Sequence, residues 1–537
     1  MTKGESMSRA TRRWRLGALL AALVVVVGVI GVGVGGATRS GADSASAATI
    51  VDGTTDSITN IDPAGQYDYG TFTLDVLAYE GLYGFPNGSK LRPMLATGCK
   101  ASTNLKTWTC TLRKNVKFSD GTPMTSADVK FSFDRVNNKH ILKQAAANTP
   151  SSLISNLKST STAGPNKVVF HLKSPQSTWP FILSTIAATA IVPKAKYSGS
   201  NLQPNTSPQI GTGPYKLVKY TPGQQAVFQP NPYYWGPKPK NGGLIINYYS
   251  KSSTMKLALQ RGEIDMAFRD FTPTELGSLA EAKGVQVHKG NGVVIRYLTF
   301  NVTRPPFNNL AVRKAIAYLM PRQTIATRVY HGTVKPLYSM VPAGLPGHVD
   351  SYKTLYGAVP NEAKAKAVLK AAGVSTPLSI DVWWTPSHYG DSSADEYAEI
   401  KRALDGSGLF KTNLKSAEWA QYSGTLGNTY GAFQLGWFPD YADAEDYTVS
   451  FYQKGNFTAN GYSDPRMTAL ISKERSARTQ GARLAAIKSM QSLAARQLPT
   501  IPYWQGNMIA VGRDNVHGID STLDPAFIMR FWRLSKS

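Results

Sequence analysis

The chain runs through 537 residues without a tandem repeat and without a linker longer than a few residues. A chain of this length is too long to fold around one simple hydrophobic core. With 42% apolar and 17% charged residues, together with 10 Trp and 26 Tyr, the composition is typical of a globular protein. Because nothing separates the chain into independent halves, we expect two or three lobes built from interwoven segments.

Strand-like and helical segments alternate along most of the chain. A strand, a helix and a further short strand follow one another from 244 to 268, and the pattern recurs at 294–330, 363–384 and 397–437. This alternation predicts an α/β fold.

One helix is predicted in detail. Thr125 and Asp128 have the spacing of a capping box. In the segment that follows, Val129, Phe133 and Val136 recur at helical spacing and predict its buried face.

The amino-terminal segment has the order of an export signal. A group of arginines at 9–15 precedes an uncharged stretch at 16–38, and the small residues at 44–48 include an Ala-Ser-Ala cleavage candidate at 45–47. We therefore expect residues 1–47 to be a signal peptide. The uncharged run has 23 residues, close to the ~20 that span a bilayer, so an uncleaved membrane anchor is the alternative.

The net charge of +25 would become +21 without residues 1–47, because that segment holds six Lys or Arg and two Asp or Glu. Nucleic-acid binding usually concentrates basic residues into runs or one helix. The only tight basic group here belongs to the export signal. We therefore expect no nucleic-acid partner, whereas binding to an anionic wall polymer remains an alternative function.

The two cysteines, Cys99 and Cys110, both lie in the exported part, where a disulfide is allowed. The segment between them predicts a hairpin, with Trp108, Cys110 and Leu112 on one face. We expect a disulfide across this hairpin. Two unrelated buried thiols are the alternative.

Several blocks of residues resemble the motifs of one family. The longest block is a run with the family's spacing: Leu112, Arg113, Val116, Phe118, Asp120, Gly121, Pro123, Thr125, Asp128 and Val129. Further blocks are Gly211 to Tyr215, Asn231 to Trp235, Gly262 to Asp265, Phe300-Asn301, Pro306-Phe307, Val312 to Ile316 and Gly436 to Tyr441. Together they cover nearly all of the chain after about residue 50. They are similar to the oligopeptide- and dipeptide-binding proteins, the extracytoplasmic solute-binding proteins of the peptide/nickel family that serve ABC importers.

The chain departs from the family pattern in two places. A helix end that is often Ala-x-Asp-Arg in the family is Met320-Pro321-Arg322 here, and Pro can open a new helix at its first position. The family's Asp-Tyr-Pro-Asp-Pro is Asp440 to Ala444 here, which keeps the acid without the two prolines.

The resemblance implies a two-lobed periplasmic-binding-protein-like α/β fold with a discontinuous first lobe and an inserted domain. Lobe I is expected from residues 48–83, 194–293 and 496–537, the inserted domain from 84–193, and lobe II from 294–495. Two hinge strands are expected near Val293 and Tyr503.

The resemblance also implies a site. In relatives the Asp of the Trp-x-x-Asp-Tyr loop pairs with the α-ammonium of a peptide, and the matching residue is Asp440, with Trp437 and Tyr441 as cleft walls. The alternative to a ligand contact is that Asp440 caps a helix. Trp419 and Tyr422 are the further pocket candidates, although large aromatics also fill cores.

No enzyme motif such as Gly-x-Ser-x-Gly or His-Glu-x-x-His occurs, and the seven His are scattered without ligand spacing. The acids Asp440, Asp443, Glu445 and Asp446 suggest a calcium loop, but their spacing matches no EF-hand. We expect no enzyme activity, no metal and no cofactor.

The expected function is capture of short peptides outside the cell or at the outer face of the cytoplasmic membrane, as a monomer that delivers them to an ABC permease and its ATPase subunits. The alternatives are a membrane-anchored, peptide-sensing co-receptor and a receptor of this fold for nickel chelates or another small solute.

Overall fold

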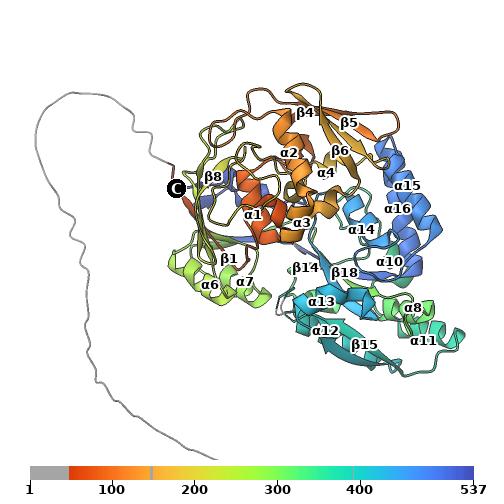
Figure 1. The fold of residues 1–537 in the computed structure, drawn as a ribbon. Coiled ribbons are helices and arrows are strands. Elements are labelled where there is room, and N and C mark those ends of the chain that lie inside the picture. Colours follow the sequence, from red (N-terminus) through yellow and green to blue (C-terminus); the bar gives the residue numbers. More distant parts are fainter. Residues whose placement is uncertain (1–46, 146–148, 387, 391) are drawn as a thin grey trace, which may run out of the picture. The chain divides into compact units, whose positions relative to one another are not determined.

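Three β-sheets of four or more strands organise the part of the chain that the structure describes (Figure 1). The structure is a computed structural model that describes residues 47–145, 149–386, 388–390 and 392–537. The predicted export signal, with Ala47 excepted, lies outside these residues.

The first sheet has seven strands in the order β12-β19-β11-β1-β10-β9-β8, and we call it the lobe I sheet. Its central strands β11, β1 and β10 are parallel, and the outer strands pair antiparallel with their neighbours. The strands are β1 (Ile50–Thr54), β8 (Tyr215–Thr221), β9 (Gln225–Pro230), β10 (Leu244–Tyr248), β11 (Met266–Phe268), β12 (Val285–Gly290) and β19 (Met508–Arg513). The helices around it are α1 (Tyr69–Ala78), α6 (Ser252–Arg261) and α7 (Pro273–Ala280), and α5 (Ile186–Thr189) of the predicted inserted domain packs on α1.

The second sheet, which we call the lobe II sheet, has six strands in the order β14-β18-β13-β17-β15-β16. β15 is parallel to both β16 and β17, whereas β13 is antiparallel to β17 and β18. The strands are β13 (Ile295–Phe300), β14 (Val334–Pro336), β15 (Leu378–Trp384), β16 (Phe410–Ser416), β17 (Ala432–Trp437) and β18 (Thr500–Gly506). The helices of this part are α8 (Leu310–Leu319), α9 (Arg322–Thr324), α10 (Ser351–Tyr356), α11 (Glu362–Ala371), α12 (Ser392–Gly406), α13 (Trp419–Thr425), α14 (Val449–Tyr452), α15 (Pro465–Ser476) and α16 (Gln480–Gln497).

The third sheet lies in the predicted inserted domain and has the order β4-β5-β7-β6. Its strands are β4 (Ala96–Ala101), β5 (Thr107–Leu112), β6 (Leu157–Thr162) and β7 (Lys167–Leu172), and its helices are α2 (Ser126–Val136), α3 (Lys139–Ala145) and α4 (Trp179–Ile182). Two short ladders complete the strands: β2 (Tyr83–Gly84) with β3 (Arg92–Pro93), and β20 (Val516–His517) with β21 (Ser535–Lys536). The described chain is thus a mixed α/β, two-lobed structure, as expected.

The chain passes twice between the two large sheets. It leaves β12 and enters β13 through residues 291–294, and it leaves β18 and enters β19 at Asn507. The two crossings touch, since a Cβ on Gly292 would lie 2.4 Å from the carbonyl oxygen of Gly506. The first crossing contains Val293, as predicted for the first hinge.

One expected boundary does not match the sheets. Residues from 496 onward were assigned to lobe I, but β18 pairs with β13 and β14 in the lobe II sheet. The second crossing is at Asn507, close to the expected position near Tyr503, which itself lies within β18. The other lobe boundaries remain predictions.

The predicted helix after Thr125 is present as α2. The Asp128 carboxylate accepts a hydrogen bond from the Thr125 amide at 2.8 Å, which confirms the capping interaction. Val129, Phe133 and Val136 are buried, as their spacing predicted.

The predicted hairpin is formed by β4 and β5, in which Cys99 and Cys110 stand directly opposite each other. Trp108, Cys110 and Leu112 are buried on its inner face. The two cysteines form a disulfide, which confirms the expected pairing.

This disulfide should make a measurable contribution to stability. It closes a loop with a sequence separation of 11, for which the chain-entropy account gives about 3 kcal/mol. We expect the double variant Cys99→Ala/Cys110→Ala to lose about that free energy of unfolding in denaturant titrations. Thiol titration of the denatured, unreduced wild type should find no free cysteine, and two free thiols would contradict the pairing.

Candidate functional site

The two large sheets present their strand ends to each other. In lobe II the carboxyl ends of the parallel strands β15, β16 and β17 meet at one edge, where the antiparallel β13 begins. In lobe I the carboxyl ends of β1, β10 and β11 meet at the edge from which β19 begins. Because the two crossings join these same edges, they face each other. Ligands of open α/β sheets bind outside the carboxyl ends of the strands, so we place the candidate site here.

Asp440 lies in the loop that follows β17 and contacts the other lobe. Its Oδ1 accepts a hydrogen bond of 2.8 Å from the hydroxyl of Tyr67, which precedes α1 in lobe I. Two residues before it, the Phe438 ring packs against Tyr69 at 5.9 Å and against Phe527 at 5.9 Å between ring centroids. The loop predicted to carry the ligand contact therefore lies between the lobes.

Asp446 holds this loop in place. Its Oδ2 accepts hydrogen bonds from the Trp437 indole N–H at 2.9 Å and from the Asp440 backbone amide at 3.1 Å. The side chain is buried, with 1% of its surface exposed. A second, fully buried carboxylate thus lies directly behind Asp440, which is itself half-buried.

Burial disfavours the charged form of both carboxyls. It raises the pKa of Asp440 to about 7, partly offset by the hydrogen bond from Tyr67. Burial and the nearby charge of Asp440 raise the pKa of Asp446 well above its usual range. Both carboxyls would be stabilised by a bound cation.

The neighbouring acids have other partners. Asp443 Oδ1 accepts a hydrogen bond from Arg483 Nη1 at 2.7 Å, and Glu445 accepts one from Arg475 at 3.3 Å. These ion pairs fix the loop to α15 and α16, so the four acids considered as a calcium loop point to different partners. Among the described residues, no group of three or more His, Cys, Asp or Glu side chains is arranged to hold a metal ion.

The predicted aromatic residues fall into two groups. Trp437 packs against Phe451 at 5.1 Å beside the Asp446 carboxylate, and Tyr441 is buried 6.1 Å from Phe181 of the inserted domain. Both lie beside Asp440 in the same loop region, and their role as cleft walls remains a prediction.

Trp419 and Tyr422 lie at the start of α13, beyond the carboxyl end of β16. Trp419 stacks on His388 with ring centroids 3.6 Å apart, in the loop that follows β15. Tyr422 has no exposed surface, and its hydroxyl donates to the Gln434 carbonyl at 2.8 Å. Tyr422 therefore fills the lobe II core. Of these two residues, Trp419 is the one that we retain as a candidate pocket wall.

An ion cluster lines the facing edge of lobe I. Arg269 pairs with Asp56, lies 3.4 Å from Asp270 Oδ1, and its guanidinium lies 4.4 Å from the Tyr69 ring centroid. Arg269 and Asp270 both have left-handed backbone conformations, with φ of 60° and 70°. Such conformations are costly for side-chain-bearing residues and cluster at functional sites.

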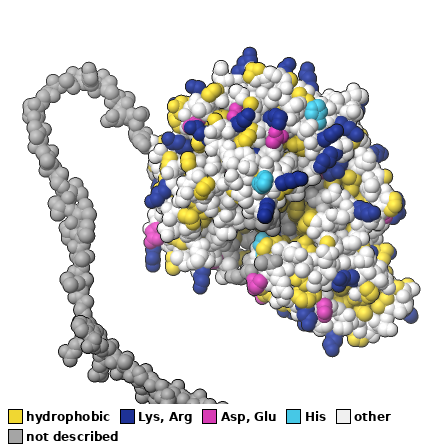
Figure 2. Space-filling view, in the orientation of Figure 1, with side chains coloured by type: hydrophobic (Ala, Val, Ile, Leu, Met, Phe, Trp, Pro, Cys, Tyr) yellow, Lys and Arg dark blue, Asp and Glu magenta, His cyan; other side chains and the backbone are white. Residues whose placement is uncertain are grey.

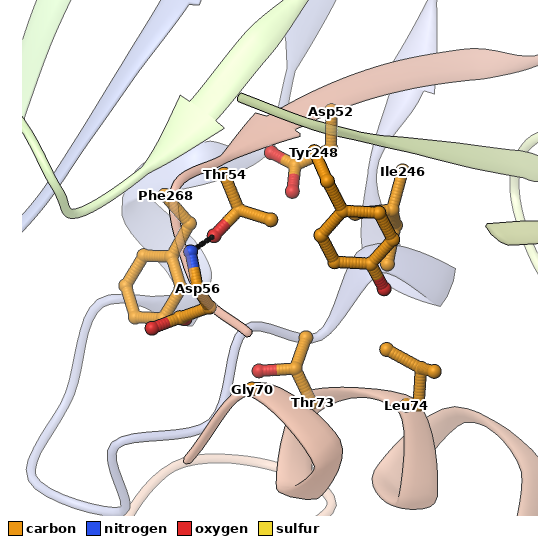
Figure 3. Close-up of a pocket in the computed structure, with 9 residues that line it drawn as sticks. All are labelled: Asp52, Thr54, Asp56, Gly70, Thr73, Leu74, Ile246, Tyr248 and Phe268. Carbon is orange, nitrogen blue, oxygen red and sulfur yellow. Dashed lines mark hydrogen bonds between the residues drawn. The ribbon is translucent and has the colours of Figure 1, made fainter. Parts of the chain in front are cut away.

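Behind this cluster lies a cavity of about 10 Å³, roughly the room that one water needs. Figure 3 shows Asp52 and Tyr248 above it and Thr73 of α1 below. Among the residues that the structure describes, Asp52 Oδ1 and the Tyr248 hydroxyl find no hydrogen-bond partner. The cavity is too small for a peptide.

The surface visible in Figure 2 carries Lys and Arg side chains spread over both large lobes, with fewer Asp and Glu. The basic residues do not gather into one stripe on this face. Within the described ranges, no helix has both the length and the apolarity that crossing a membrane requires.

Sequence reasoning missed several residues of this site. From the sequence, Asp446 was considered only as a cation ligand. Its hydrogen bonds with Trp437 and the Asp440 amide depend on the conformation of the loop, which residue spacing does not reveal. Tyr67 and Phe438 had no local signal, since their contacts join residues of different lobes.

The chain has relatives of known function and neighbours of similar fold along most of its length. The chain is 27% identical over 484 residues to a dipeptide-binding protein of Pseudomonas aeruginosa, an alignment that covers 85% of this chain and 89% of the relative. Its fold is similar to that of a dipeptide-binding protein from Pseudoalteromonas sp. SM9913 in complex with Met-Leu, with a TM-score of 0.76, 22% identity and coverage of 91% and 100% of the two chains. It is also similar to NikA from Brucella suis in complex with Fe(III)-EDTA, with a TM-score of 0.78, 21% identity and the same coverage.

The profile of one family, the bacterial extracellular solute-binding proteins, family 5, matches residues 90–459, which is more than half of the chain. Those residues include most of lobe II, the inserted domain and the loop that carries Asp440. The chain therefore belongs to the bacterial extracellular solute-binding proteins of family 5.

Proposed function

We propose that this protein captures short peptides between its two lobes and delivers them to an ABC permease. The observation that carries the proposal is the pair Asp440 and Asp446, two carboxyls at the facing lobe edges whose contacts come from neutral donors. A buried carboxylate without a cationic partner is costly unless a ligand supplies the cation. The α-ammonium of a peptide supplies such a cation and donates up to three hydrogen bonds.

The aromatic walls suit a ligand whose side chains vary. Trp437, Trp419 and Phe438 offer broad apolar faces without a demanding pattern of hydrogen bonds. A site of this kind fixes the peptide terminus and tolerates different side chains. The dipeptide-binding relative supports the same substrate class.

The finer assignments follow from this role. The protein acts as a monomer, either outside the cell or at the outer face of the cytoplasmic membrane. If the amino-terminal segment is retained, it tethers the protein to that membrane. Its partners are a permease and the ATPase subunits of that permease. Because relatives of this fold also hold a metal chelate, a receptor for nickel chelates or another solute is the competing function, along with a peptide-sensing co-receptor.

Asp440→Asn tests the proposal, because it keeps the size of the side chain and removes its charge. Loss of one partner from a desolvated charge pair typically costs ~2–5 kcal/mol, so we expect a free-amine peptide to bind at least about 30-fold more weakly. N-acetylation of the peptide should weaken binding to the wild type similarly. The two losses should not add, because both remove the same interaction. Titration calorimetry with Met-Leu and with di-, tri- and tetraalanine measures all four combinations.

Asp134→Asn is the matched control. Asp134 lies exposed on α2, where it pairs with Lys130, so this variant should bind like the wild type. Equal binding of acetylated and free peptides would contradict the role of Asp440. Absence of binding by every peptide would contradict the proposed cargo.

Peptide affinity should depend on pH through Asp440. Since burial raises the pKa of this carboxyl to about 7, it carries a proton in a growing share of molecules below pH 7, and that proton must leave before the ammonium can pair. We expect affinity to fall by up to about tenfold per pH unit below 7, and to fall again above about pH 8, where the peptide's own α-ammonium loses its proton. The Asp440→Asn variant, measured by calorimetry from pH 5 to 8, should show a much flatter profile.

The same carboxyl should affect the stability of the ligand-free protein. A carboxyl whose pKa is higher in the folded than in the unfolded state stabilises the fold fully only below its unfolded value, and this contribution is lost as the pH rises through the folded pKa. For Asp440 that window runs from about 3.8 to about 7. Thermal unfolding without ligand should therefore show Asp440→Asn gaining stability over the wild type as the pH rises from 4 to 8. A constant difference would contradict the raised pKa.

A further inference from the structure

The inserted domain carries about half of the positive charge of the exported part. Residues 84–193 hold 14 Lys or Arg and three Asp or Glu, a net charge of +11 against +21 for residues 48–537. The three acids all lie between 120 and 134, so the stretches 84–119 and 135–193 contain no Asp or Glu. The strands β4, β5, β6 and β7 and the turns of their two hairpins belong to these stretches. The sheet therefore carries positive charge without any acid of its own.

One face of this sheet is covered by helices and the other is open. Phe170 of β7 is paired with Trp108 of β5, and both are buried. The Phe170 ring packs against Phe133 of α2 at 4.8 Å and against Trp179 of α4 at 5.6 Å between ring centroids. Because side chains alternate across a strand, the residues on either side of Trp108 and Phe170 point to the opposite face.

The register of the strands places lysines and hydroxyls together on this open face. Lys100 of β4 is paired with Thr109 of β5, and Lys167 of β7 is paired with Thr111 of β5. Both lysines are exposed. With neighbouring strands ~4.8 Å apart and a rise of ~3.4 Å per residue, their Cα atoms lie about 12 Å apart. The hydroxyls of the same face belong to Thr107, Thr109, Thr111, Ser159 and Ser161.

The positive charges of the sheet are not compensated by neighbouring acids. Among the described residues of this domain, the basic side chains that form ion pairs are Lys130, with Asp134, and Arg135, with Asp62. Both belong to α2 and not to the sheet. Lys158 of β6 is exposed like Lys100 and Lys167, so three of the four strands each present one lysine to solvent. A surface with an excess of one charge attracts partners of the opposite charge.

The open face is turned away from the candidate peptide site. The inserted domain meets the Asp440 loop through Phe181 of α4, whose ring lies 6.1 Å from that of Tyr441. The same helix packs on the covered face of the sheet through Trp179. A partner on the open face would therefore not compete with a ligand between the lobes.

The side chains of the open face select among anionic partners. Proteins that lie on a membrane combine basic side chains with apolar ones that enter the lipid, and single-stranded nucleic acids stack their bases on aromatic rings. Among the described residues, the exposed large hydrophobic side chains lie outside these four strands. Lysine acts as a point charge that suits a phosphate, and Thr and Ser hydroxyls donate hydrogen bonds to its oxygens. A phosphate polymer without bases or acyl chains fits this surface.

We propose that the open face of the β4-β5-β7-β6 sheet binds a linear phosphodiester polymer of the poly(glycerol phosphate) kind outside the cell. Lys100, Lys158 and Lys167 contact its phosphates, and the neighbouring hydroxyls donate to the phosphate oxygens. Such a polymer holds the protein in the cell envelope while the site between the lobes stays accessible. The inference does not depend on which solute the lobes capture.

The test measures binding of the exported protein to poly(glycerol phosphate) by biolayer interferometry, from about 50 to about 300 mM NaCl. The variant Lys100→Gln/Lys158→Gln/Lys167→Gln should bind at least about tenfold more weakly at the lowest salt concentration. Its log Kd should also depend less steeply on log salt, because fewer counterions are released from the polymer.

The matched control is Lys366→Gln/Lys370→Gln/Lys411→Gln. It removes the same charge from exposed positions on α11 and β16 and should bind the polymer like the wild type. Thermal unfolding checks that both triple variants are folded. Equal losses of affinity in the two variants would mean that only the overall charge matters, and would overturn the proposal.

The wild type alone tests which polyanion the surface prefers, so this arm needs no variant. Poly(glycerol phosphate) should bind more tightly than mixed phosphatidylglycerol and phosphatidylcholine vesicles, oligo-dT or polyglutamate at equal concentrations of negative charge. Tighter binding of the vesicles would assign the surface to a membrane, of oligo-dT to nucleic acid, and of polyglutamate to carboxylate polymers. Each of these results, or no binding of poly(glycerol phosphate) at the lowest salt concentration, would overturn the proposal and leave peptide capture unaffected.

Discussion

The site depends on a topological constraint: the carboxyl ends of the parallel strands in both large sheets face each other across the crossings at 291–294 and Asn507. Loops that follow parallel strands gather at one edge of a sheet, and here two such edges are held together by two short connections. Everything proposed about the ligand follows from this arrangement. Asp440 follows β17, and Trp419 follows β16.

The charged side chains at the facing edges are of two kinds: some form ion pairs within the fold, and others are held by neutral hydrogen-bond donors. Arg269, Asp443 and Glu445 have counter-ions within the fold, and these pairs hold the walls in place. Among the described residues, the hydrogen bonds to Asp440 and Asp446 come from neutral donors. In a low-dielectric interface such groups are the ones whose free energy a charged ligand lowers most. The same imbalance makes the ligand-free site a point of low stability.

Much of the fold was accessible from local patterns. Helical spacing predicted the buried face of α2, and the alternation of residues around Cys99 and Cys110 predicted the hairpin and its disulfide. The motif that ends at Tyr441 identified Asp440 and Trp437, which the structure brings together with Asp446. Tyr422 was misplaced because a helix-start aromatic has the same local pattern whether it faces a pocket or a core.

The sequence by itself determined the α/β class, the hairpin and the family motifs, because these depend on residues close together along the chain. Only the tertiary structure decided that β18 belongs to lobe II, that Tyr67 contacts Asp440, and that Arg269 pairs with Asp56. Those facts depend on which distant residues share one place in space. Charge balance in particular cannot be inferred from spacing, since it is set by distances between side chains brought together from different lobes.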